Sequence, residues 1–383
     1  MSYLALYRKY RSKTFDEIIG QKHITQSLIN QISNGQVGHA YLFTGTRGTG
    51  KTSIAKIFAR AINCLSPKNG SPCNKCEACS ALGNNVNVDI LEIDAASNNR
   101  VDEIRDLREK VKYPPVVGKY KVYIIDEVHM LTDSAFNALL KTLEEPPEYV
   151  VFILATTEVH KLPATILSRC MRFDFKLISQ EELESHVKYI FKDSGIKYED
   201  EAVSIIASLG AGSVRDTLSI ADMCVAYSNN NVTYESVVEA IGLTDRETLK
   251  ILTTSILSGD EGVLLENIDK VARSGKNITQ LSKDLVGYIR DVLVVKTCKD
   301  YADILKSPAT QLKELKTLAD STTSDRLIEM LSRLSRLDNE YRYTTNPRNL
   351  LEITLVSLCK FEMTEINELK MRLKVLESKV NKG

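Results

Sequence analysis

The sequence is short of three features, and each shortage excludes a class of protein. It has no net charge, because 50 lysines and arginines balance 50 aspartates and glutamates, so any nucleic-acid surface must be a local patch. No apolar run is long enough to cross a bilayer, and the stretch 150–155 reads as a buried strand. Residues 1–13 hold no signal-peptide core with a cleavage site. We therefore expect a cytoplasmic protein that does not associate with a membrane.

The size and composition are those of a globular protein with several domains. The chain has 383 residues, of which 43% are hydrophobic and 26% are charged. These fractions are typical of folded proteins. The length predicts about two to four domains with substantial hydrophobic cores.

Residues 45–52 form a complete phosphate-binding loop, Gly-Thr-Arg-Gly-Thr-Gly-Lys-Thr. A strand-like segment at 39–43 precedes it and a segment with helical periodicity at 53–60 follows, which is the context that this motif requires. The glycines let backbone N–H groups converge on phosphate oxygens, Lys51 would reach the β- and γ-phosphates, and the Thr52 hydroxyl would bind Mg²⁺. The alternative, a glycine turn before an ordinary helix, is disfavoured by a second motif downstream. The predicted nucleotide contacts are Gly45, Thr46, Arg47, Gly48, Thr49, Gly50, Lys51, Thr52 and Ser53.

Residues 122–127, Val-Tyr-Ile-Ile-Asp-Glu, read as a buried strand that ends in two acids. Asp126 would hold Mg²⁺ through water, and Glu127 would polarise the water that attacks the γ-phosphate. The alternative is a strand end with two solvated acids, which the upstream loop disfavours. Strands that alternate with helices predict a doubly wound α/β domain through about residue 178, with its ligand at the carboxyl ends of the strands.

Four of the eight cysteines lie close together, at Cys64, Cys73, Cys76 and Cys79. In a cytosolic nucleotide-binding protein, such a cluster favours a metal site over disulfides. Four thiolates with short chelating spacings suit a structural Zn²⁺, although an iron–sulfur cluster uses the same ligands. Reduced thiols without a metal are the third interpretation.

Several longer segments carry a family resemblance. They are YRKYRSKTFDEIIGQ at 7–21, EIDAASNNRVDEIRDL at 92–107, IIDEVHMLTDSAFNALLKTLEEPPEYVVFILATTE at 124–158, ILSRC at 166–170 and GSVRDTLS at 212–219. Together they resemble the gamma/tau subunit family of bacterial DNA polymerase III, the AAA+ ATPases of the clamp loader. The resemblance spans residues 1–225.

The resemblance implies a fold class and a set of domains. We expect an α/β P-loop AAA+ domain at 1–178, a helical lid at 179–242, an all-α collar that holds the oligomer together at 243–365, and an amphipathic helix or tail start at 366–383. The family carries a four-cysteine zinc insertion after the P-loop helix, which favours zinc in a module at about 64–79. Longer, tau-type members continue further, so we expect either a short gamma-like form or a truncated piece.

The resemblance also assigns roles around the nucleotide. Arg169 resembles the arginine finger that acts in trans on a neighbouring subunit's ATP, although alone it reads as a surface arginine at a helix end. Arg215 resembles the sensor-2 arginine, and Thr157, otherwise a turn or helix-cap residue, resembles a γ-phosphate sensor. No guanine-reading NKxD motif lies in a suitable position, which favours ATP over GTP. The segment that encloses the adenine would contribute Tyr7, Arg8, Tyr10, Ile18 and Ile19.

The position that faces the primer–template junction in the family holds Asn98, Asn99 and Arg100. Arg100 beside a helix N-terminus would contact phosphate oxygens without reading sequence. Further charges on the helix expected over residues 101–112 read as a solvated face with paired acids.

The resulting hypothesis is an ATPase of the DNA polymerase III holoenzyme that opens a sliding clamp and loads it onto primed DNA. ATP, Mg²⁺ and Zn²⁺ are its expected cofactors. Its expected partners are the delta and delta-prime subunits and further copies of itself, which together form a pentameric core. We expect this complex to be associated with the nucleoid during replication. The alternatives are another AAA+ machine, such as a branch-migration motor or helicase loader, and a non-catalytic scaffold.

Overall fold

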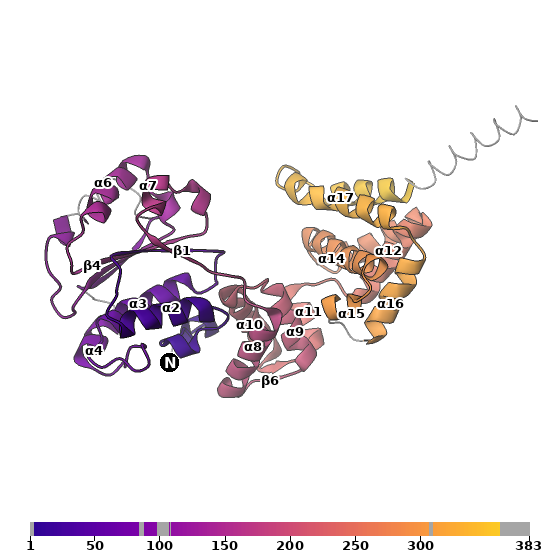
Figure 1. Cartoon of the computed structure of the whole chain (residues 1–383). Helices are drawn as coiled ribbons and strands as arrows, with labels where there is room; N and C mark the ends of the chain where they lie inside the picture. The colour runs from indigo at the N-terminus through magenta and orange to yellow at the C-terminus, as the bar shows by residue number, and fades with distance from the viewer. Residues whose placement is uncertain (1–3, 84–87, 98–106, 108, 306–308, 361–383) are drawn as a thin grey trace, which may run out of the picture. The chain divides into compact units, whose positions relative to one another are not determined.

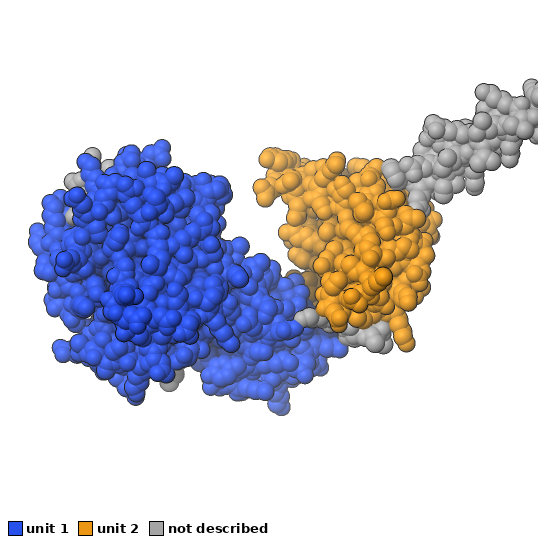
Figure 2. All heavy atoms as spheres, in the orientation of Figure 1, with its two compact units in different colours: residues 1–237 blue, residues 238–383 orange. Residues whose placement is uncertain are grey.

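The computed structural model describes residues 4–83, 88–97, 107, 109–305 and 309–360. The chain divides into two compact units, residues 1–237 and 238–383 (Figure 2). Within the described ranges, no helix combines the length and the apolarity that crossing a membrane requires. The segment 366–383, for which an amphipathic helix is predicted, lies outside the described residues.

A five-stranded parallel sheet forms the centre of the first unit. Its order is β2-β3-β4-β1-β5. The strands are β1 (Ala40–Thr44), β2 (Ile90–Asp94), β3 (Lys121–Asp126), β4 (Val150–Thr156) and β5 (Met171–Asp174). The strands β1 and β4 are buried along their whole length, as continuous apolar strands of a sheet covered on both faces are expected to be. The predicted α/β domain is confirmed.

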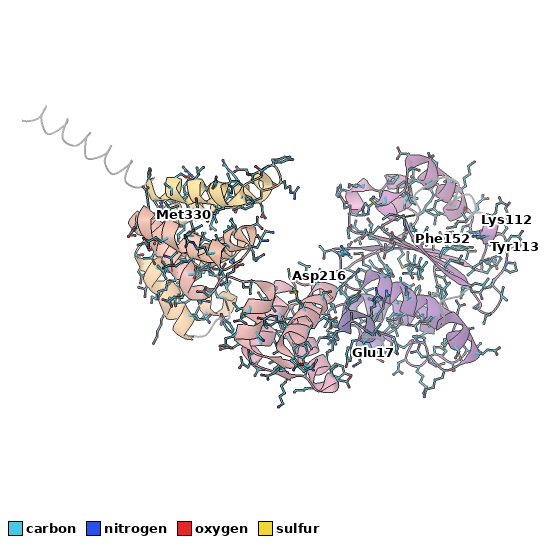
Figure 3. All side chains as sticks on the ribbon, turned by 180° about the vertical axis from the view of Figure 1, so that it is seen from behind. Glu17, Lys112, Tyr113, Phe152, Asp216 and Met330 are labelled. Atoms are coloured by element: carbon cyan, nitrogen blue, oxygen red, sulfur yellow. The ribbon has the colours of Figure 1, made fainter. Side chains whose placement is uncertain are left out.

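Side chains that alternate along each strand supply two separate cores. On β1, Tyr41 and Phe43 point into the core under α2 (Lys22–Ser33) and α3 (Lys51–Ile62). Leu42, with Phe152 from β4, points into the opposite core under α6 (Asp133–Glu144) and α7 (Ala164–Leu167). Figure 1 shows these helix pairs on opposite faces of the sheet, and Figure 3 labels Phe152 within it. The period of two residues therefore places every apolar side chain of a strand in one of two layers.

Short elements connect this framework. The 3₁₀ turns and short helices are α1 (Leu6–Lys9), η1 (Phe15–Glu17), α4 (Glu77–Gly83), η2 (Val128–Met130) and η3 (Val159–Lys161). Both η2 and η3 directly follow the carboxyl ends of central strands, β3 and β4. They therefore lie at the edge of the sheet where a ligand is expected.

A small, mainly helical part completes the first unit. It contains α8 (Gln180–Ser194), α9 (Asp200–Leu209) and α10 (Val214–Ser228), and the division between the two units falls within the next helix, α11 (Tyr234–Ile241). Ser179 and Glu182 form a capping box that starts α8. The Gly-Ala-Gly sequence that separates α9 from α10 ends with Gly212 at φ 82°, a conformation that glycine adopts at little cost.

The expectation of helices alone for residues 179–242 was incomplete. Two strands, β6 (Lys197–Tyr198) and β7 (Asn231–Val232), pair in parallel within this part. Strands of two residues are too short to produce a periodic pattern in a sequence, so periodicity could not reveal them.

The second unit is built from helices around its own core. They are α12 (Arg246–Ser258), α13 (Glu261–Arg273), α14 (Ile278–Thr297), α15 (Tyr301–Leu305), α16 (Ala309–Asp320), α17 (Ser324–Glu340) and a helix over residues 347–360. Leu252, Ile289, Met330 and Leu355 are fully buried in one cluster, and Figure 3 labels Met330 on α17. The helical character predicted for this region is confirmed.

Replacing Ile289 with alanine is expected to lower the free energy of unfolding of the second unit by about 2–5 kcal/mol, because it leaves a cavity in a closed core. Ile353→Ala is the matched control, since Ile353 is 68% exposed and its replacement should change that free energy by about 0.5 kcal/mol or less. Urea denaturation followed by circular dichroism measures both variants. Equal effects would contradict the described core.

Candidate nucleotide-binding site

The loop between β1 and α3 has a backbone that only glycine fits well. Gly45, Gly48 and Gly50 have φ angles of 143°, 78° and 103°, in the region that side chains disfavour. A Cβ atom on Gly45 would lie 2.5 Å from the carbonyl oxygen of Phe175, and one on Gly48 would lie 1.9 Å from Ser213 Oγ. Both conformation and space therefore require glycine at the first two positions.

Lys51, the first residue of α3, is buried and turned onto this loop. Its Nζ donates to the carbonyl oxygens of Gly45 at 2.7 Å and Thr46 at 2.9 Å. Burial lowers the pKa of Lys51, and the nearby carboxylates of Glu127 and Asp126 oppose that shift. The ammonium group is therefore held at the loop, close to two acids from another strand.

The carboxyl ends of β3 and β4 bring the remaining polar groups together. Thr52 Oγ1 donates to Asp126 Oδ2 at 2.6 Å, which joins the helix after the loop to the end of β3. Thr157 Oγ1 donates to Glu127 Oε2 at 3.1 Å, which joins the end of β4 to the same place. A hydroxyl and a carboxylate this close are suitable ligands for Mg²⁺.

Most of the residues predicted to contact nucleotide line one cavity of about 760 Å³. Of the predicted set it is lined by Tyr7, Arg8, Tyr10, Ile18, Ile19, Arg47, Gly48, Thr49, Gly50, Lys51, Thr52, Ser53, Asp126, Glu127 and Arg215. The predicted residues that do not line it are Gly45, Thr46, Thr157 and Arg169. The first three still touch residues that do.

Sequence reasoning missed several lining residues. They are Arg11, Ser12, Asp94, Ala96, His186, Val214 and Leu218. Asp94 ends β2, so its place at the carboxyl edge of the sheet was a signal that could have found it. His186 lies within an ordinary amphipathic helix and offered no such signal.

The helical part of the first unit touches the phosphate-binding loop directly. The backbone N–H of Val214 donates to the carbonyl oxygen of Gly48 at 3.0 Å. One residue further along α10, the Arg215 guanidinium carbon lies 5.6 Å from the centre of the Tyr7 ring, within the range of a cation–π contact. Residues far apart in the sequence therefore close one side of the cavity.

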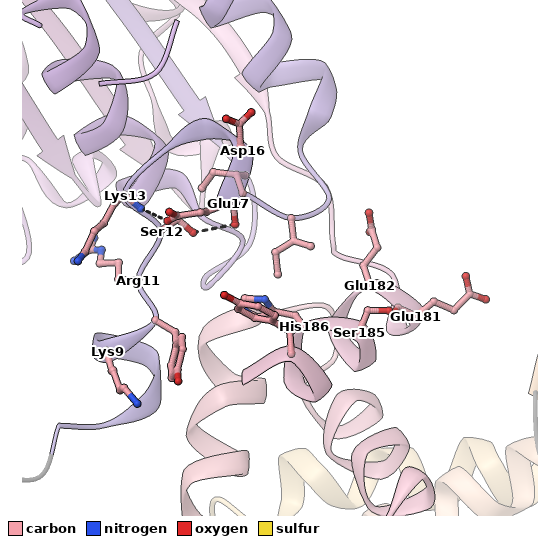
Figure 4. A pocket seen from close by; sticks show the side chains of 14 residues that line it. Lys9, Arg11, Ser12, Lys13, Asp16, Glu17, Glu181, Glu182, Ser185 and His186 are labelled. Atoms are coloured by element: carbon pink, nitrogen blue, oxygen red, sulfur yellow. Dashed lines mark hydrogen bonds between the residues drawn. The ribbon is translucent and has the colours of Figure 1, made fainter. Parts of the chain in front are cut away.

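The segment from Tyr10 to Phe15, here called the strap, crosses between two parts of the first unit. At one end, Tyr10 Oη donates to Asp193 Oδ2 at 2.5 Å near the end of α8. At the other end, the Phe15 N–H donates to Ser71 Oγ at 3.0 Å within the cysteine loop. The strap and α8 also line a hollow of about 680 Å³, in which Lys13 N–H donates to Glu17 Oε2 at 2.6 Å (Figure 4).

Arg169 stands apart from the cavity of its own chain. It follows α7, where its Nη1 donates to the Thr165 carbonyl oxygen and its Nη2 to Glu144 Oε1, each at 2.8 Å. The side chain is 34% exposed, so a molecule outside the chain can reach it.

The four clustered cysteines converge on one point. All four Sγ atoms lie within 4.8 Å of one another, with Cys64–Cys76 at 3.9 Å and Cys73–Cys79 at 4.0 Å. Tetrahedral zinc with Zn–S bonds of about 2.3 Å places sulfur atoms about 3.8 Å apart. Backbone N–H groups of Lys75 and Cys76 lower the pKa of Cys73 to about 5, whereas burial raises the pKa of Cys64 and Cys79. A coordinated metal would deprotonate these two thiols as well. The donor set therefore fits a tetrahedral metal.

Three family models match the chain. They are described as DNA polymerase III delta subunit, over residues 20–179, the ATPase lid domain of the DNA polymerase III clamp loader subunit, over 182–230, and domain III of DNA polymerase III subunits gamma and tau, over 232–373. DNA polymerase III subunit tau of Bacillus subtilis is 41% identical over all of this chain and 69% of its own length. The chain belongs to the gamma/tau subunit family of DNA polymerase III. The family contains the clamp-loader ATPases, so the first unit is an AAA+ P-loop domain followed by a lid, and a helical domain follows.

Other gamma/tau relatives differ in how far they extend. The gamma subunit of Buchnera aphidicola is 38% identical over 78% of this chain and 82% of its own length. The tau/gamma subunit of Haemophilus influenzae is 45% identical over 71% of this chain, but the match covers only 40% of that relative. Among solved structures, the Thermotoga maritima RuvB branch migration motor matches with a TM-score of 0.47 and 21% identity, over 64% of this chain and 79% of its own. The Bacillus subtilis clamp loader delta protein matches with a TM-score of 0.36 and 15% identity, over 88% of this chain and 99% of its own.

The gamma/tau resemblance assigns three residues to DNA contact. Asn98, Asn99 and Arg100 lie outside the described residues, and so does most of the helix predicted over 101–112. Their contact with DNA stays a prediction.

Replacing Gly48 with alanine is expected to lower the affinity for nucleotide by at least about tenfold, or 1.4 kcal/mol, because the new Cβ would push the lid away from the loop. Gly35→Ala is the matched control. Gly35 also has positive φ, at 66°, but nothing lies within 4 Å of a Cβ added there, so it shares the backbone strain without the clash. Titration with a fluorescent ATP analogue measures both, and equal affinities would contradict the loop–lid contact.

Proposed function

We propose that this gamma/tau-family chain binds and hydrolyses ATP to open a sliding clamp and to load it onto primed DNA. One observation carries the proposal: the phosphate-binding loop, the two acids of β3 and the lid arginine Arg215 all line one cavity. Cations and a helix N-terminus on one side and acids on the other match the needs of Mg-ATP.

Each side chain has a proposed task in this cavity. Lys51 neutralises the β- and γ-phosphates, and Thr52 with Asp126 holds Mg²⁺. Glu127 is the general base for the attacking water, and Thr157 holds the carboxylate of Glu127 in place. The adenine is proposed to lie against the N-terminal segment that lines the cavity, near Tyr7, Arg8, Tyr10, Ile18 and Ile19.

Hydrolysis is proposed to need a second subunit. Arg169 lies outside its own cavity and is partly exposed, which suits a finger that reaches the γ-phosphate bound by a neighbour. The proposed assembly is a pentameric core with delta, delta-prime and further copies of this chain. ATP between subunits would hold the core around the clamp, and primed DNA would trigger hydrolysis and release. A lone chain should therefore bind ATP but hydrolyse it slowly.

The four-cysteine module is proposed to hold a structural Zn²⁺. Its Sγ spacing and its donated N–H groups support a closed tetrahedral site. The proposed domains remain 1–178, 179–242, 243–365 and the segment from 366. The family-model spans ending at 179 and 230, and the compact unit ending at 237, support three folded parts.

The reconstituted complex tests this function. Clamp and primed DNA together are expected to stimulate its steady-state ATPase, and Arg169→Ala should reduce the stimulated rate at least about tenfold while ATP binding persists. Arg172→Ala is the control, because Arg172 is a nearby exposed arginine paired with Asp174 and should keep the wild-type rate. If clamp and primed DNA did not change the ATPase rate of the wild-type complex, another AAA+ function would be favoured. If the wild-type protein did not bind ATP, a non-catalytic scaffold would be favoured.

Metal analysis tests the cysteine module. Purified protein is expected to contain about one zinc per chain, and Cys76→Ser should lose it and melt at a lower temperature. Cys298→Ser should keep the metal, since Cys298 lies at the end of α14, outside the cluster. Bound iron with visible absorption would support the iron–sulfur interpretation instead, and protein without any bound metal would support free thiols.

A further inference from the structure

His129 is a buried side chain beside the proposed general base. It lies in η2, two residues after Glu127, and its side chain is only 6% exposed. Its Nδ1 is 3.0 Å from Thr156 Oγ1, and its Nε2 is 3.2 Å from Glu158 Oε1. Nδ1 is also 3.5 Å from Glu127 Oε2. The ring therefore joins the turn after β3 to the end of β4.

Both nitrogens of the His129 ring have a polar partner. Thr156 Oγ1 already accepts from the Glu158 N–H at 3.0 Å, so its own hydrogen can be donated to Nδ1 of His129. Nε2–H then donates to Glu158. A ring hydrogen on Nε2 is compatible with both contacts at once. Lys161, at 2.8 Å from Glu158, lowers the pKa of that carboxyl group and so keeps it an acceptor.

These contacts lie on both sides of Glu127, the proposed general base, and Thr157, which is proposed to hold its carboxylate. Thr157, which donates to Glu127 Oε2, stands in the chain between Thr156 and Glu158, the two partners of His129. The backbone of Glu127 has φ 48°, a left-handed conformation that costs a non-glycine residue about 1–2 kcal/mol and persists only where its surroundings enforce it. The Met130 N–H closes the turn on the Glu127 carbonyl at 2.9 Å, and His129 ties that turn to β4.

We propose that His129 is a positioning residue for ATP hydrolysis, which holds the Glu127 carboxylate and the Thr157 hydroxyl at a fixed separation. This inference rests on the proposed ATPase function. His129 itself does not line the cavity, so its proposed action is through its neighbours. A misplacement of about 1 Å in such a group can cost a hundredfold in rate.

The test uses the assembled complex with clamp, primed DNA and saturating Mg-ATP. His129→Ala is expected to lower kcat by about ten- to a hundredfold while the nucleotide Kd stays within about twofold, because the loop and the lid are untouched. His129→Asn can keep the contact to Thr156, and His129→Gln can keep the contact to Glu158, so each should recover part of the lost rate. His160→Ala is the control, since His160 also approaches Glu158, at 3.7 Å, but is 73% exposed; its kcat should equal that of the wild type.

A double-mutant cycle separates positioning from a general structural role. In a Thr157→Val background, His129→Ala should add little further loss, because the contact between the Thr157 hydroxyl and the Glu127 carboxylate that His129 maintains is already absent. The inference would be overturned if the two substitutions lowered kcat by fully additive amounts, or if the affinity for nucleotide fell by the same factor as kcat.

If His129→Ala does not fold, wild-type kcat in both His129→Asn and His129→Gln would overturn the inference, and partial losses of kcat in both would support it. A wild-type complex that does not hydrolyse ATP would overturn the proposed function and this inference with it, whereas an active wild type with unaffected variants would overturn this inference alone.

Discussion

The site depends on parallel strands whose carboxyl ends meet at one edge of the sheet, and the hydrogen bond between Thr52 and Asp126 is formed at that edge. It joins the start of α3 to the end of β3 across 2.6 Å, and it can form only because β1, β4 and β3 run in parallel and end together. Thr44 at the end of β1 pairs with Thr156 at the end of β4, and β4 pairs in turn with β3. Apolar side chains fill both faces of these strands, so polar groups concentrate at their carboxyl ends.

The lid forms a second side of the cavity at this edge of the sheet. Val214 donates to Gly48 and Arg215 lies over Tyr7, so the loop, the lid and the N-terminal segment meet at one place. A bound nucleotide that touches both loop and lid would stabilise this arrangement, because ligands favour the conformation to which they bind best. The same contact explains why a glycine is needed at a position that faces the lid rather than the phosphates.

The cysteine loop is linked to the nucleotide cavity through the strap. Ser71 accepts from the Phe15 N–H, and the Phe15 ring is buried in the core beneath α2 and α3. Ile18 and Ile19, which follow one short turn later in the chain, line the cavity. A metal that orders the cysteine loop would therefore also order one wall of the nucleotide site, which is a structural rather than a chemical contribution.

Local patterns in the sequence were sufficient for the α/β class, the phosphate-binding loop, the acids of β3 and the cysteine cluster. Each depends on residues close together in the chain, such as Gly45 to Thr52, where spacing alone defines the chemistry. The tertiary structure alone brought Arg11, His186 and Val214 to the cavity and placed His129 against Thr156 and Glu158. These contacts join elements distant in sequence, and no local period records them because packing of the sheet, the lid and the strap decides which side chains face one another.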